Sequence, residues 1–493
     1  MIARLLLALA LLVIGCTQEN PVFCDETRPC AEGACDLTRN ACAAVAPCRA
    51  NVDCGTKLAP ICGEFGLCRG CGRSYLDCSV RNPALGVCDA GSCRSCTEDS
   101  ECPRTLPACQ EGVCSPCKEG GGGDALCAER GDDATTCRGG ACSQCTVGED
   151  CNGLKPICEL GLCRGCQQHT ECLSNVCGGD GSCLPENDVL FVSRAGSMES
   201  PCGTAENPCA LIEGALSQIA PSSEKRIIRV LDGNYDERIK IDARHGAGRV
   251  TLLGPTGAGK KSTLRGLIAD DGAVVEVANL DFHPIDGEQG DGVVCDGRFG
   301  ATELVLRGIS VSEYRVGIRA ENCRRLEVRR SEVLRNQAGG LSTDANQEIL
   351  VQNSLFWSNG SSSSNDAPIK LSAESAKFLW NTVVGNQTGQ ALFSCSSVVE
   401  LSNNILRGNS GVVSRGKCNW SHSLFDVDGV EGVGNLVDDP LFLDEFAEPP
   451  NARLSPVSIA IDSANDLEPP ALDLAGNPRV LGGRADLGAY EAN

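Results

Sequence analysis

Val351-Gln-Asn-Ser-Leu-Phe356 is one of six similar segments that follow one another along the second half of the chain. The others are Leu306–Val311, Val328–Val333, Leu379–Val384, Leu401–Leu406 and Trp420–Phe425, so successive segments start 22, 23, 28, 22 and 19 residues apart. A period near 22 residues, with short apolar strands and Asn or Gly at the turns, is typical of one three-strand coil of a parallel β-helix. A helical solenoid of similar period would need long stretches with a 3.6-residue period, and these are missing. The segments therefore predict an all-β solenoid, a right-handed parallel β-helix, because crossovers between parallel strands are right-handed.

We expect this solenoid to occupy residues 188–435. At its start, the segment 210–220 places Leu211, Ile212, Ala215 and Leu216 on one helical face. An amphipathic helix ahead of repeated strands would seal the open end of the solenoid.

Asn353, Asn381 and Asn403 align in one column of the predicted coils. Stacked asparagines can hydrogen-bond to the coils above and below and tolerate left-handed backbone, so we interpret the column as a structural ladder; a ligand site is the alternative.

Six cysteines lie within this half of the chain: Cys202, Cys209, Cys295, Cys323, Cys395 and Cys418. Cys202 and Cys209 flank a tight loop and are expected to pair. Residues one coil apart stack ~4.8 Å from each other, within the Cα range of a disulfide. Cys395–Cys418 and Cys295–Cys323 are therefore candidate staples between neighbouring coils.

A disulfide-rich arm is expected before the solenoid, because residues 24–183 contain seven consecutive sets of four cysteines. The sets are Cys24–Cys42, Cys48–Cys68, Cys71–Cys93, Cys96–Cys114, Cys117–Cys142, Cys145–Cys163 and Cys166–Cys183. A unit of about 24 residues cannot bury enough apolar surface to fold on its own core, so disulfides replace that core. Four cysteines allow three connectivities, and all three stay open. Zinc is the competing use of Cys-x2-Cys pairs, but histidine is nearly absent and the compartment is expected to be oxidising.

An acidic residue precedes the second cysteine in five units: Asp53, Asp77, Glu101, Asp150 and Glu171. Such a residue can cap a turn or ligate calcium, and both interpretations stay open.

The first fifteen residues have the pattern of an export signal. Arg4 precedes the apolar run Leu5–Ile14, and ten apolar residues span only ~15 Å as a helix, too short to cross a bilayer. Val13-Ile14-Gly15-Cys16 resembles the lipobox of bacterial lipoproteins, which implies cleavage before Cys16, acylation of Cys16 and a membrane partner reached through that lipid. Residues 16–23 would then form a tether, and Thr17 in place of Asp favours the bacterial outer membrane, with the chain lipid-anchored at the cell surface.

The overall charge narrows the set of partners. The 493-residue chain has a formal net charge of −22 at pH 7. This argues against nucleic acid and against anionic membrane surfaces as partners. Gly254–Lys260 is similar to a phosphate-binding loop, but Lys261 stands where the motif has Ser or Thr, so we expect no nucleotide and interpret the stretch as a loop between strands.

Two family resemblances rest on these motifs. The coils resemble the pectate-lyase-like family of right-handed parallel β-helices. Five carboxyl-terminal motifs resemble the choice-of-anchor Q module and define it here as residues 436–493: Asp439–Phe442, Arg453–Pro456, Ile461–Ser463, Asp473 with Gly476–Arg479, and Ala485–Glu491. Ser463–Asn465 departs from the usual glycine-containing segment of that module.

Two sets of residues are candidates for chemistry. Asp286, Asp291 and Asp296 each precede glycine at five-residue intervals and could hold calcium, as enzymes of the pectate-lyase-like family often do; plain Asp-Gly turns are the alternative. Arg315, Arg319, Arg324 and Arg329 belong to a run of seven arginines within 21 residues and could bind uronate carboxylates; a solvated charged face is the alternative.

The sequence thus predicts a cell-surface lipoprotein without catalysis, in which the arm holds a β-helix out for adhesion or for binding extracellular glycans or surface proteins. We assign no catalytic residue, because no paired carboxylates of the glycosidase type appear on adjacent coils. The alternative is a polysaccharide lyase or glycoside hydrolase that acts on acidic polysaccharide. It requires the arginine run and the Asp-Gly residues to meet in one groove.

Overall fold

The structure is a computed structural model. It describes residues 92–492 except 131–133, 153–154, 160, 220–225, 246–247, 258–260, 286–289, 466–468 and 481–483, together with Cys78, Leu85, residues 87–89 and the backbone of four short strands before them. The chain divides into two compact units, one of residues 1–152 and 157–163 and the other of residues 153–156 and 164–493. Within the described residues no helix has the length and apolar character needed to span a membrane.

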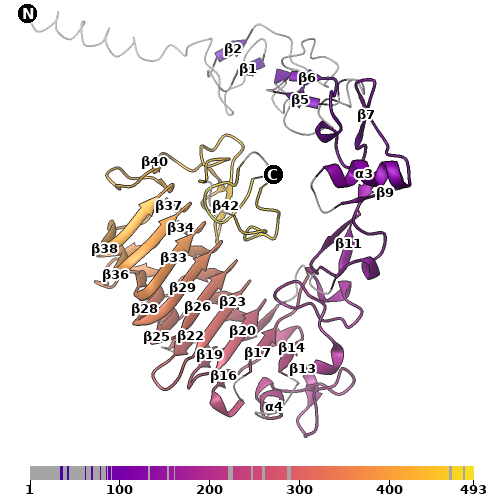
Figure 1. The fold of residues 1–493 in the computed structure, drawn as a ribbon. Helices are drawn as coiled ribbons and strands as arrows, with labels where there is room; N and C mark the ends of the chain where they lie inside the picture. Colours follow the sequence, from indigo (N-terminus) through magenta and orange to yellow (C-terminus); the bar gives the residue numbers. More distant parts are fainter. Residues whose placement is uncertain are drawn as a thin grey trace, which may run out of the picture. The chain divides into compact units, whose positions relative to one another are not determined.

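The described part of the first unit contains a series of short hairpins (Figure 1). Each described hairpin joins two short antiparallel strands, and these are β1 (Ala34–Asp36) with β2 (Ala41–Ala43), β3 (Ile61–Cys62) with β4 (Cys68–Arg69), β5 (Val87–Asp89) with β6 (Ser92–Arg94), β7 (Ala108–Gln110) with β8 (Val113–Ser115), β9 (Thr136–Arg138) with β10 (Ala141–Ser143), and β11 (Ile157–Glu159) with β12 (Leu162–Arg164). One repeat adds the helix α3 (Gly121–Glu129).

One disulfide connectivity recurs in every repeat where both bonds are described. The first cysteine pairs with the third and the second with the fourth, as in Cys96–Cys109, Cys102–Cys114, Cys117–Cys137, Cys127–Cys142, Cys145–Cys158, Cys151–Cys163, Cys166–Cys177 and Cys172–Cys183. The third and fourth cysteines oppose each other across the hairpin, for example Cys109 and Cys114. Their side chains therefore point to one side of the hairpin, where each meets a different cysteine of the preceding loop. The expected disulfide-rich region is confirmed.

The acidic residue before the second cysteine caps a turn in the described repeats. Glu101, Asp150 and Glu171 each accept a 2.6 Å hydrogen bond from a backbone N–H four residues earlier. Arg94 and Arg164 hold the pKa of Glu101 and Glu171 at about 2, because they stabilise the ionised carboxylates. The carboxylates thus complete the local fold, as the turn-capping interpretation expects; Asp53 and Asp77 lie outside the described residues.

The second unit contains a right-handed parallel β-helix, which confirms the predicted fold class (Figure 1). Three stacks of parallel strands follow one another in each coil, and we call them sheets 1, 2 and 3. Sheet 1 comprises β13 (Val189–Ser197), β14 (Ile227–Val230), β17 (Val250–Leu253), β20 (Val274–Ala278), β23 (Glu303–Arg307), β26 (Arg325–Arg329), β29 (Asn346–Gln352) and β33 (Ala373–Leu379). Sheet 2 comprises β15 (Gly233–Asn234), β18 (Ser262–Leu264), β21 (Asp281–Phe282), β24 (Ser310–Ser312), β27 (Glu332–Leu334), β30 (Leu355–Trp357), β34 (Thr382–Val384), β37 (Ile405–Arg407), β39 (Leu424–Phe425) and β40 (Leu436–Val437).

Sheet 3 comprises β16 (Arg238–Ile241), β19 (Gly266–Ala269), β22 (Asp291–Asp296), β25 (Val316–Glu321), β28 (Gly339–Asp344) and β32 (Ile369–Leu371). The long strand β36 (Ala391–Ser402) joins sheets 3 and 1 in a late coil, and β38 (Val412–Ser421) pairs with it. A further parallel pair is formed by β31 (Gly360–Ser361) and β35 (Gln387–Thr388), each of which follows a strand of sheet 2 and precedes a strand of sheet 3.

The interior of the solenoid is a continuous column of apolar side chains. Towards its carboxyl end a file of aromatic rings, Phe356, Phe378, Phe393, Trp420 and Phe425, has centroids 5.0–5.5 Å apart. At the other end the short helix α4 (Ile212–Leu216) buries Ile212, Ala215 and Leu216. The capping helix is therefore shorter than the sequence pattern over 210–220 suggests.

The three disulfides of the solenoid are Cys202–Cys209, Cys295–Cys323 and Cys395–Cys418. The last two join neighbouring coils, since Cys295 and Cys395 lie on β22 and β36 while their partners belong to the following coil.

The predicted asparagine column is wrong by one residue at Asn381. Phe378 pairs with Val351 and Leu401, so the core residue of that coil is Phe378 and not Leu379. Trp380 therefore stands beside Asn353 and Asn403, and all three have a left-handed backbone with φ between 51° and 59°. Asn381 belongs to the next column, where it accepts from the Ser354 N–H and its own N–H donates to Asn404 Oδ1.

The described residues after β40 cover the outer face of the last strands of sheet 2, and we call them the carboxyl-terminal module. It contains the hairpin of β41 (Phe442–Asp444) and β42 (Asn451–Leu454). Its side chains Leu454, Ala485 and Leu487 pack with Ile405 and Leu424 of sheet 2.

The motif residues of this module form its own polar core. Arg479 is only 1% exposed, and its Nη2 donates to the carbonyl oxygens of Asp486, at 3.0 Å, and Gly488. Asp473 accepts from the backbone N–H groups of Asn477 and Glu491. Burial lowers the pKa of Arg479 to about 10, while the buried carboxylates around it favour its charged form.

The seventh cysteine repeat is docked on the first coils of the solenoid. His169 is buried, and its Nε2 lies 2.8 Å from the Gly254 carbonyl oxygen while its Nδ1 accepts from the Cys177 N–H. Val176 packs with Leu253 and Ala278 on the outer face of sheet 1. The stretch that is similar to a phosphate-binding loop thus contributes to this junction, since Thr256 accepts from the His169 N–H.

Candidate functional site

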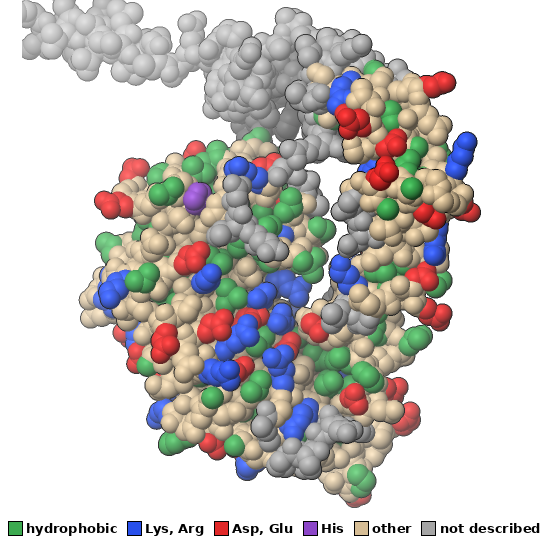
Figure 2. All heavy atoms as spheres, viewed as in Figure 1, with side chains coloured by type: hydrophobic (Ala, Val, Ile, Leu, Met, Phe, Trp, Pro, Cys, Tyr) green, Lys and Arg blue, Asp and Glu red, His purple; other side chains and the backbone are tan. Residues whose placement is uncertain are grey.

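Charged side chains gather on the outer face of sheet 1 (Figure 2), over the strands labelled β17 to β26 in Figure 1. The cause is the two-residue period of the strands: Leu304, Leu306, Leu326 and Val328 point into the core, so their neighbours point outward. Register then aligns the outward residues of successive coils. Arg307 stands beside Arg329, and Glu303 beside Arg325.

Two buried carboxylates at this face are shared among four arginines. Glu276 lies 3.0 Å from Arg249 and 3.3 Å from Arg307. Glu327 lies 3.2 Å from Arg307, 2.6 Å from Arg325 and 2.7 Å from Arg329. The exposed fractions of Glu276 and Glu327 are 7% and 1%, so the carboxylates of these ion pairs are shielded from water.

Arg330 adds a fifth guanidinium at the corner that follows β26. It is half-buried, has a φ of 47°, and makes no ion pair or side-chain hydrogen bond within the described part of the chain. Burial lowers the pKa of Arg330, and the neighbouring charges of Arg307 and Arg329 lower it further, against an opposing effect of Asp473. Burial likewise lowers the pKa of Arg329. We call Arg249, Arg307, Arg325, Arg329, Arg330, Glu276 and Glu327 the arginine face.

Two neighbouring parts of the same unit border the arginine face. In the seventh repeat, a Cβ atom added at Gly179 would lie 2.8 Å from Glu276 Oε1 and 3.5 Å from Arg307 Cδ, so glycine permits the close approach. At the other side, Asn353 donates to the carbonyl oxygen of Leu472 in the carboxyl-terminal module at 2.6 Å.

The arginines predicted from the sequence do not converge. Arg315 and Arg319 belong to the sheet 3 side of the coil, where each lies 2.7 Å from Asp291. Arg324 precedes β26 and lies 3.1 Å from Glu303, with 60% of its side chain exposed. Of the four predicted residues only Arg329 belongs to the arginine face.

The two described Asp-Gly residues, Asp291 and Asp296, do not form a common site either. Asp291 and Asp296 are the first and last residues of β22, and Asp286 lies outside the described residues. Asp291 is held by its two arginines, and Asp296 pairs with Arg298. In the part of the chain that the structure describes, no three Asp, Glu or His side chains bring their ligand atoms close enough to share a metal ion.

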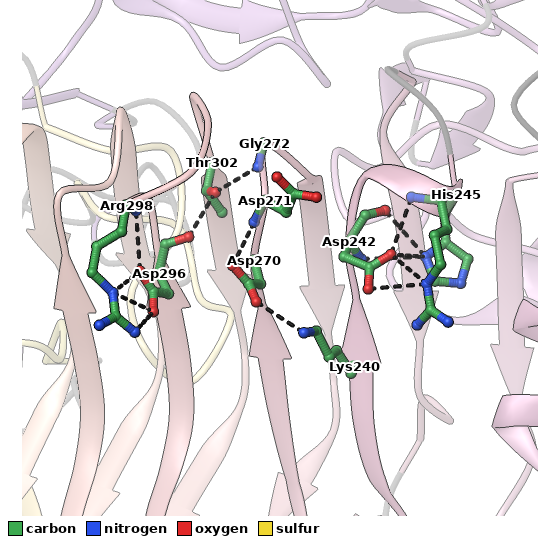
Figure 3. A network of polar contacts seen from close by, with 10 residues as sticks. Lys240, Asp242, His245, Asp270, Asp271, Gly272, Asp296, Arg298 and Thr302 are labelled. Atoms are coloured by element: carbon green, nitrogen blue, oxygen red, sulfur yellow. Dashed lines mark hydrogen bonds and ion pairs between the residues drawn. The ribbon is translucent and has the colours of Figure 1, made fainter.

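Asp296 belongs instead to a network at the carboxyl ends of the sheet 3 strands (Figure 3). Strand register places Asp242, Asp270 and Asp296 side by side in three successive coils. Each has its own cation, with Asp242 2.9 Å from Arg244, Asp270 2.9 Å from Lys240, and Asp296 held by Arg298. These pairs offset the repulsion between stacked carboxylates, so the network stabilises the edge of the sheet.

Sequence reasoning missed Arg249, Glu276, Arg307 and Glu327, whereas Arg325 and Arg330 belong to the predicted arginine run but were not selected from it. The signal was the alternation Arg325-Leu-Glu-Val-Arg329, which places three charges on one face of a strand, together with Arg307 one coil earlier. Closeness in sequence did not predict which arginines lie on the same face, because one coil passes through all three sheets.

A protein-family model agrees with the fold. Residues 265–429 match the family model of the right-handed β-helix region. Among solved structures, the chain is similar to a crystal structure of the pectate lyase Pel9A, with 11% identity and a TM-score of 0.30 over 62% of this chain and 96% of that one. No curated protein matches the chain.

Proposed function

We propose that this chain is a lipid-anchored protein of the bacterial cell surface, in which the disulfide-rich arm presents a non-catalytic β-helix that binds glycans. The arginine face supports acidic glycans as the ligands. Five guanidiniums surround Glu276 and Glu327 there, and Glu348 lies 3.8 Å from Arg325, so guanidiniums outnumber the carboxylates paired with them in a chain whose formal net charge is −22. Arginine binds a carboxylate or a sulfate group through two parallel hydrogen bonds, and partial burial strengthens such contacts.

The observation that carries this proposal is Arg330, a half-buried guanidinium that makes no ion pair or side-chain hydrogen bond in the described chain, although the charge of Asp473 acts on it from a distance. A partly buried cation with no ion pair or hydrogen bond is costly, and an anion of a ligand would relieve that cost. The alternative, a lyase or hydrolase that acts on acidic polysaccharide, would need a carboxylate free to transfer protons. At the arginine face Glu276 and Glu327 are both held by two or three arginines.

The test is the binding of the full mature chain to immobilised polygalacturonate, alginate and chondroitin sulfate, with neutral dextran as reference. We expect binding to the acidic polymers that weakens with salt, and a loss of roughly tenfold in affinity for Arg330→Gln, since hydrogen bonds to charged groups are among the stronger ones. Arg244→Gln is the matched control, because Arg244 is exposed and pairs with Asp242 away from this face. Equal retention on dextran, or an unchanged affinity of Arg330→Gln, would contradict the proposal.

The same incubations test the enzymatic alternative. Release of unsaturated or reducing ends from any polymer would overturn the non-catalytic assignment. Lipid anchoring is tested separately with Cys16→Ser, a position outside the described residues. We expect this variant to lose acyl labelling and to leave the membrane fraction.

A further inference from the structure

A second set of polar groups lies on the outer face of sheet 2, where the cover provided by the carboxyl-terminal module ends. Asp281, Ser310 and Glu332 occupy one outward column in three successive coils. The next residue of that column is Leu355, which the module buries against Leu474 and Tyr490. The column thus changes from polar to apolar at Glu332, at the margin of the module.

Two groups at this margin have unsatisfied hydrogen-bonding capacity. Neither the Glu332 carboxyl group nor the Tyr490 hydroxyl makes a hydrogen bond or ion pair within the described residues, although both side chains are half-buried. The polar atoms of both groups reach solvent, so a ligand can replace the water bound to them. Burial raises the pKa of Glu332, and Asp281 adds to that effect while Lys261 opposes it. Burial also raises the pKa of Tyr490, with the charge of Glu332 acting in the same direction.

The groups around them make the site nearly balanced in charge. Lys261 lies 3.2 Å from Asp281, so the pair is neutral as a whole. Ser310, between Asp281 and Glu332, has a hydroxyl that no described residue binds. Asp281 and Glu332 are two coils apart, which corresponds to about 9.6 Å between their backbones.

We infer that Glu332, Tyr490, Ser310, Asp281 and Lys261 form a binding site for an uncharged sugar, separate from the arginine face. A sugar hydroxyl both donates and accepts, so adjacent hydroxyls can satisfy an acceptor such as Glu332 and a donor such as Tyr490 together. The aromatic ring of Tyr490 packs with the apolar cluster that contains Leu355, so an apolar surface adjoins these polar groups, a combination found in ligand sites. The unpaired carboxylate of Glu332 disfavours an anionic ligand, and the Arg453 guanidinium, 5.9 Å from the centroid of the Tyr490 ring, disfavours a cationic one.

The test uses the full mature chain and cellohexaose, mannohexaose and maltohexaose as probes, followed by saturation-transfer NMR, with chitosan hexamer and trigalacturonate as charged comparisons. We expect at least one neutral oligosaccharide to bind, and both Tyr490→Phe and Glu332→Leu to weaken it about tenfold or more. Glu400→Leu is the matched control, because Glu400 is an outward carboxylate on β36 paired with Lys377.

The stability of Glu332→Leu also distinguishes a ligand site from a carboxyl group that is merely unpaired. Replacement of a half-buried, unpaired carboxyl by leucine should leave stability unchanged or higher, so a loss of binding would not reflect unfolding. Absence of binding by all neutral probes, binding only of a charged probe, or unchanged affinity in both variants would each overturn the inference. Acidic polymers that bind the arginine face should bind Glu332→Leu normally, so the two proposals fail independently.

Discussion

Asn386→Ala is the substitution that tests most directly how the coils are held in register. Asn386 is completely buried in a ladder formed by Asn336, Asn359, Asn386 and Asn409. Its Oδ1 accepts from the backbone N–H and the side-chain amide of Asn359, both at 2.9 Å. Its Nδ2 donates to the carbonyl oxygens of Phe356 and Val384 and to Asn409 Oδ1.

Alanine removes all five of these side-chain hydrogen bonds. The Asn359 N–H then has no acceptor, and an orphaned buried donor costs about 1–3 kcal/mol. The remaining groups keep other partners in part, since the Val384 carbonyl still accepts from the Ser358 N–H. Their loss adds roughly 0.5–1.5 kcal/mol for each bond not replaced. We therefore expect a destabilisation of about 2–5 kcal/mol.

Tryptophan fluorescence during urea unfolding measures this change in the β-helix alone. All three tryptophans of the chain, Trp357, Trp380 and Trp420, belong to it, whereas the arm has none. Asn419→Ala is the matched control, because Asn419 is exposed on β38 and its side chain makes no hydrogen bond in the described structure. A cost for Asn386→Ala as small as that of the control would refute the idea that the ladder sets the register.

Two other predictions concern groups held by charge. Arg479→Met leaves the buried Asp473, Asp486 and Glu491 without their cation, so we expect a loss of about 3–5 kcal/mol, seen as faster hydrogen exchange and proteolysis of residues 436–493. Protection at the same level as in the wild type would show that the carboxylates do not need Arg479. In the seventh repeat, the folded pKa of Glu171 is about 2, below its usual value of 4.5, so its stabilising effect is fully present above pH ~4.5 and is lost as the pH falls through 2. Glu171→Gln should therefore abolish this acid dependence in hydrogen exchange of residues 166–183, and an unchanged dependence would assign it to other groups.

The arm shows how far cysteine spacing can be interpreted. The division of the cysteines into sets of four was enough to predict disulfides, since each unit is too small to form an apolar core. The pairing of first with third and second with fourth cysteines could not be predicted, because it depends on the hairpin that sets Cys109 opposite Cys114. That hairpin forms only in the folded unit, and its three-residue strands are too short to give a clear sequence pattern.

The register of the solenoid shows a different limit. Phe378 and Leu379 are both apolar, and the alignment chose Leu379 for the core, although the structure buries Phe378 there. A two-residue period changes the face of every side chain when it slips by one position. Leu379 is covered from outside as well, with only 7% of its surface exposed, so hydrophobicity alone did not separate the two. Consequently Trp380, and not Asn381, occupies the left-handed corner beside Asn353.

The arginine run explains why the candidate site was only partly predicted. The 21 residues from Arg315 to Arg335 nearly complete one coil, so they pass along sheet 3, sheet 1 and sheet 2 in turn. Residues close in sequence therefore lie on different faces of the solenoid, as Arg319 on sheet 3 and Arg329 on sheet 1 do. Residues that meet in space are separated by one coil, as Arg307 and Arg329 are by 22 positions. In a β-helix a binding face is consequently encoded as a column of residues one coil apart, and a ligand that binds several arginines must extend along the axis of the solenoid.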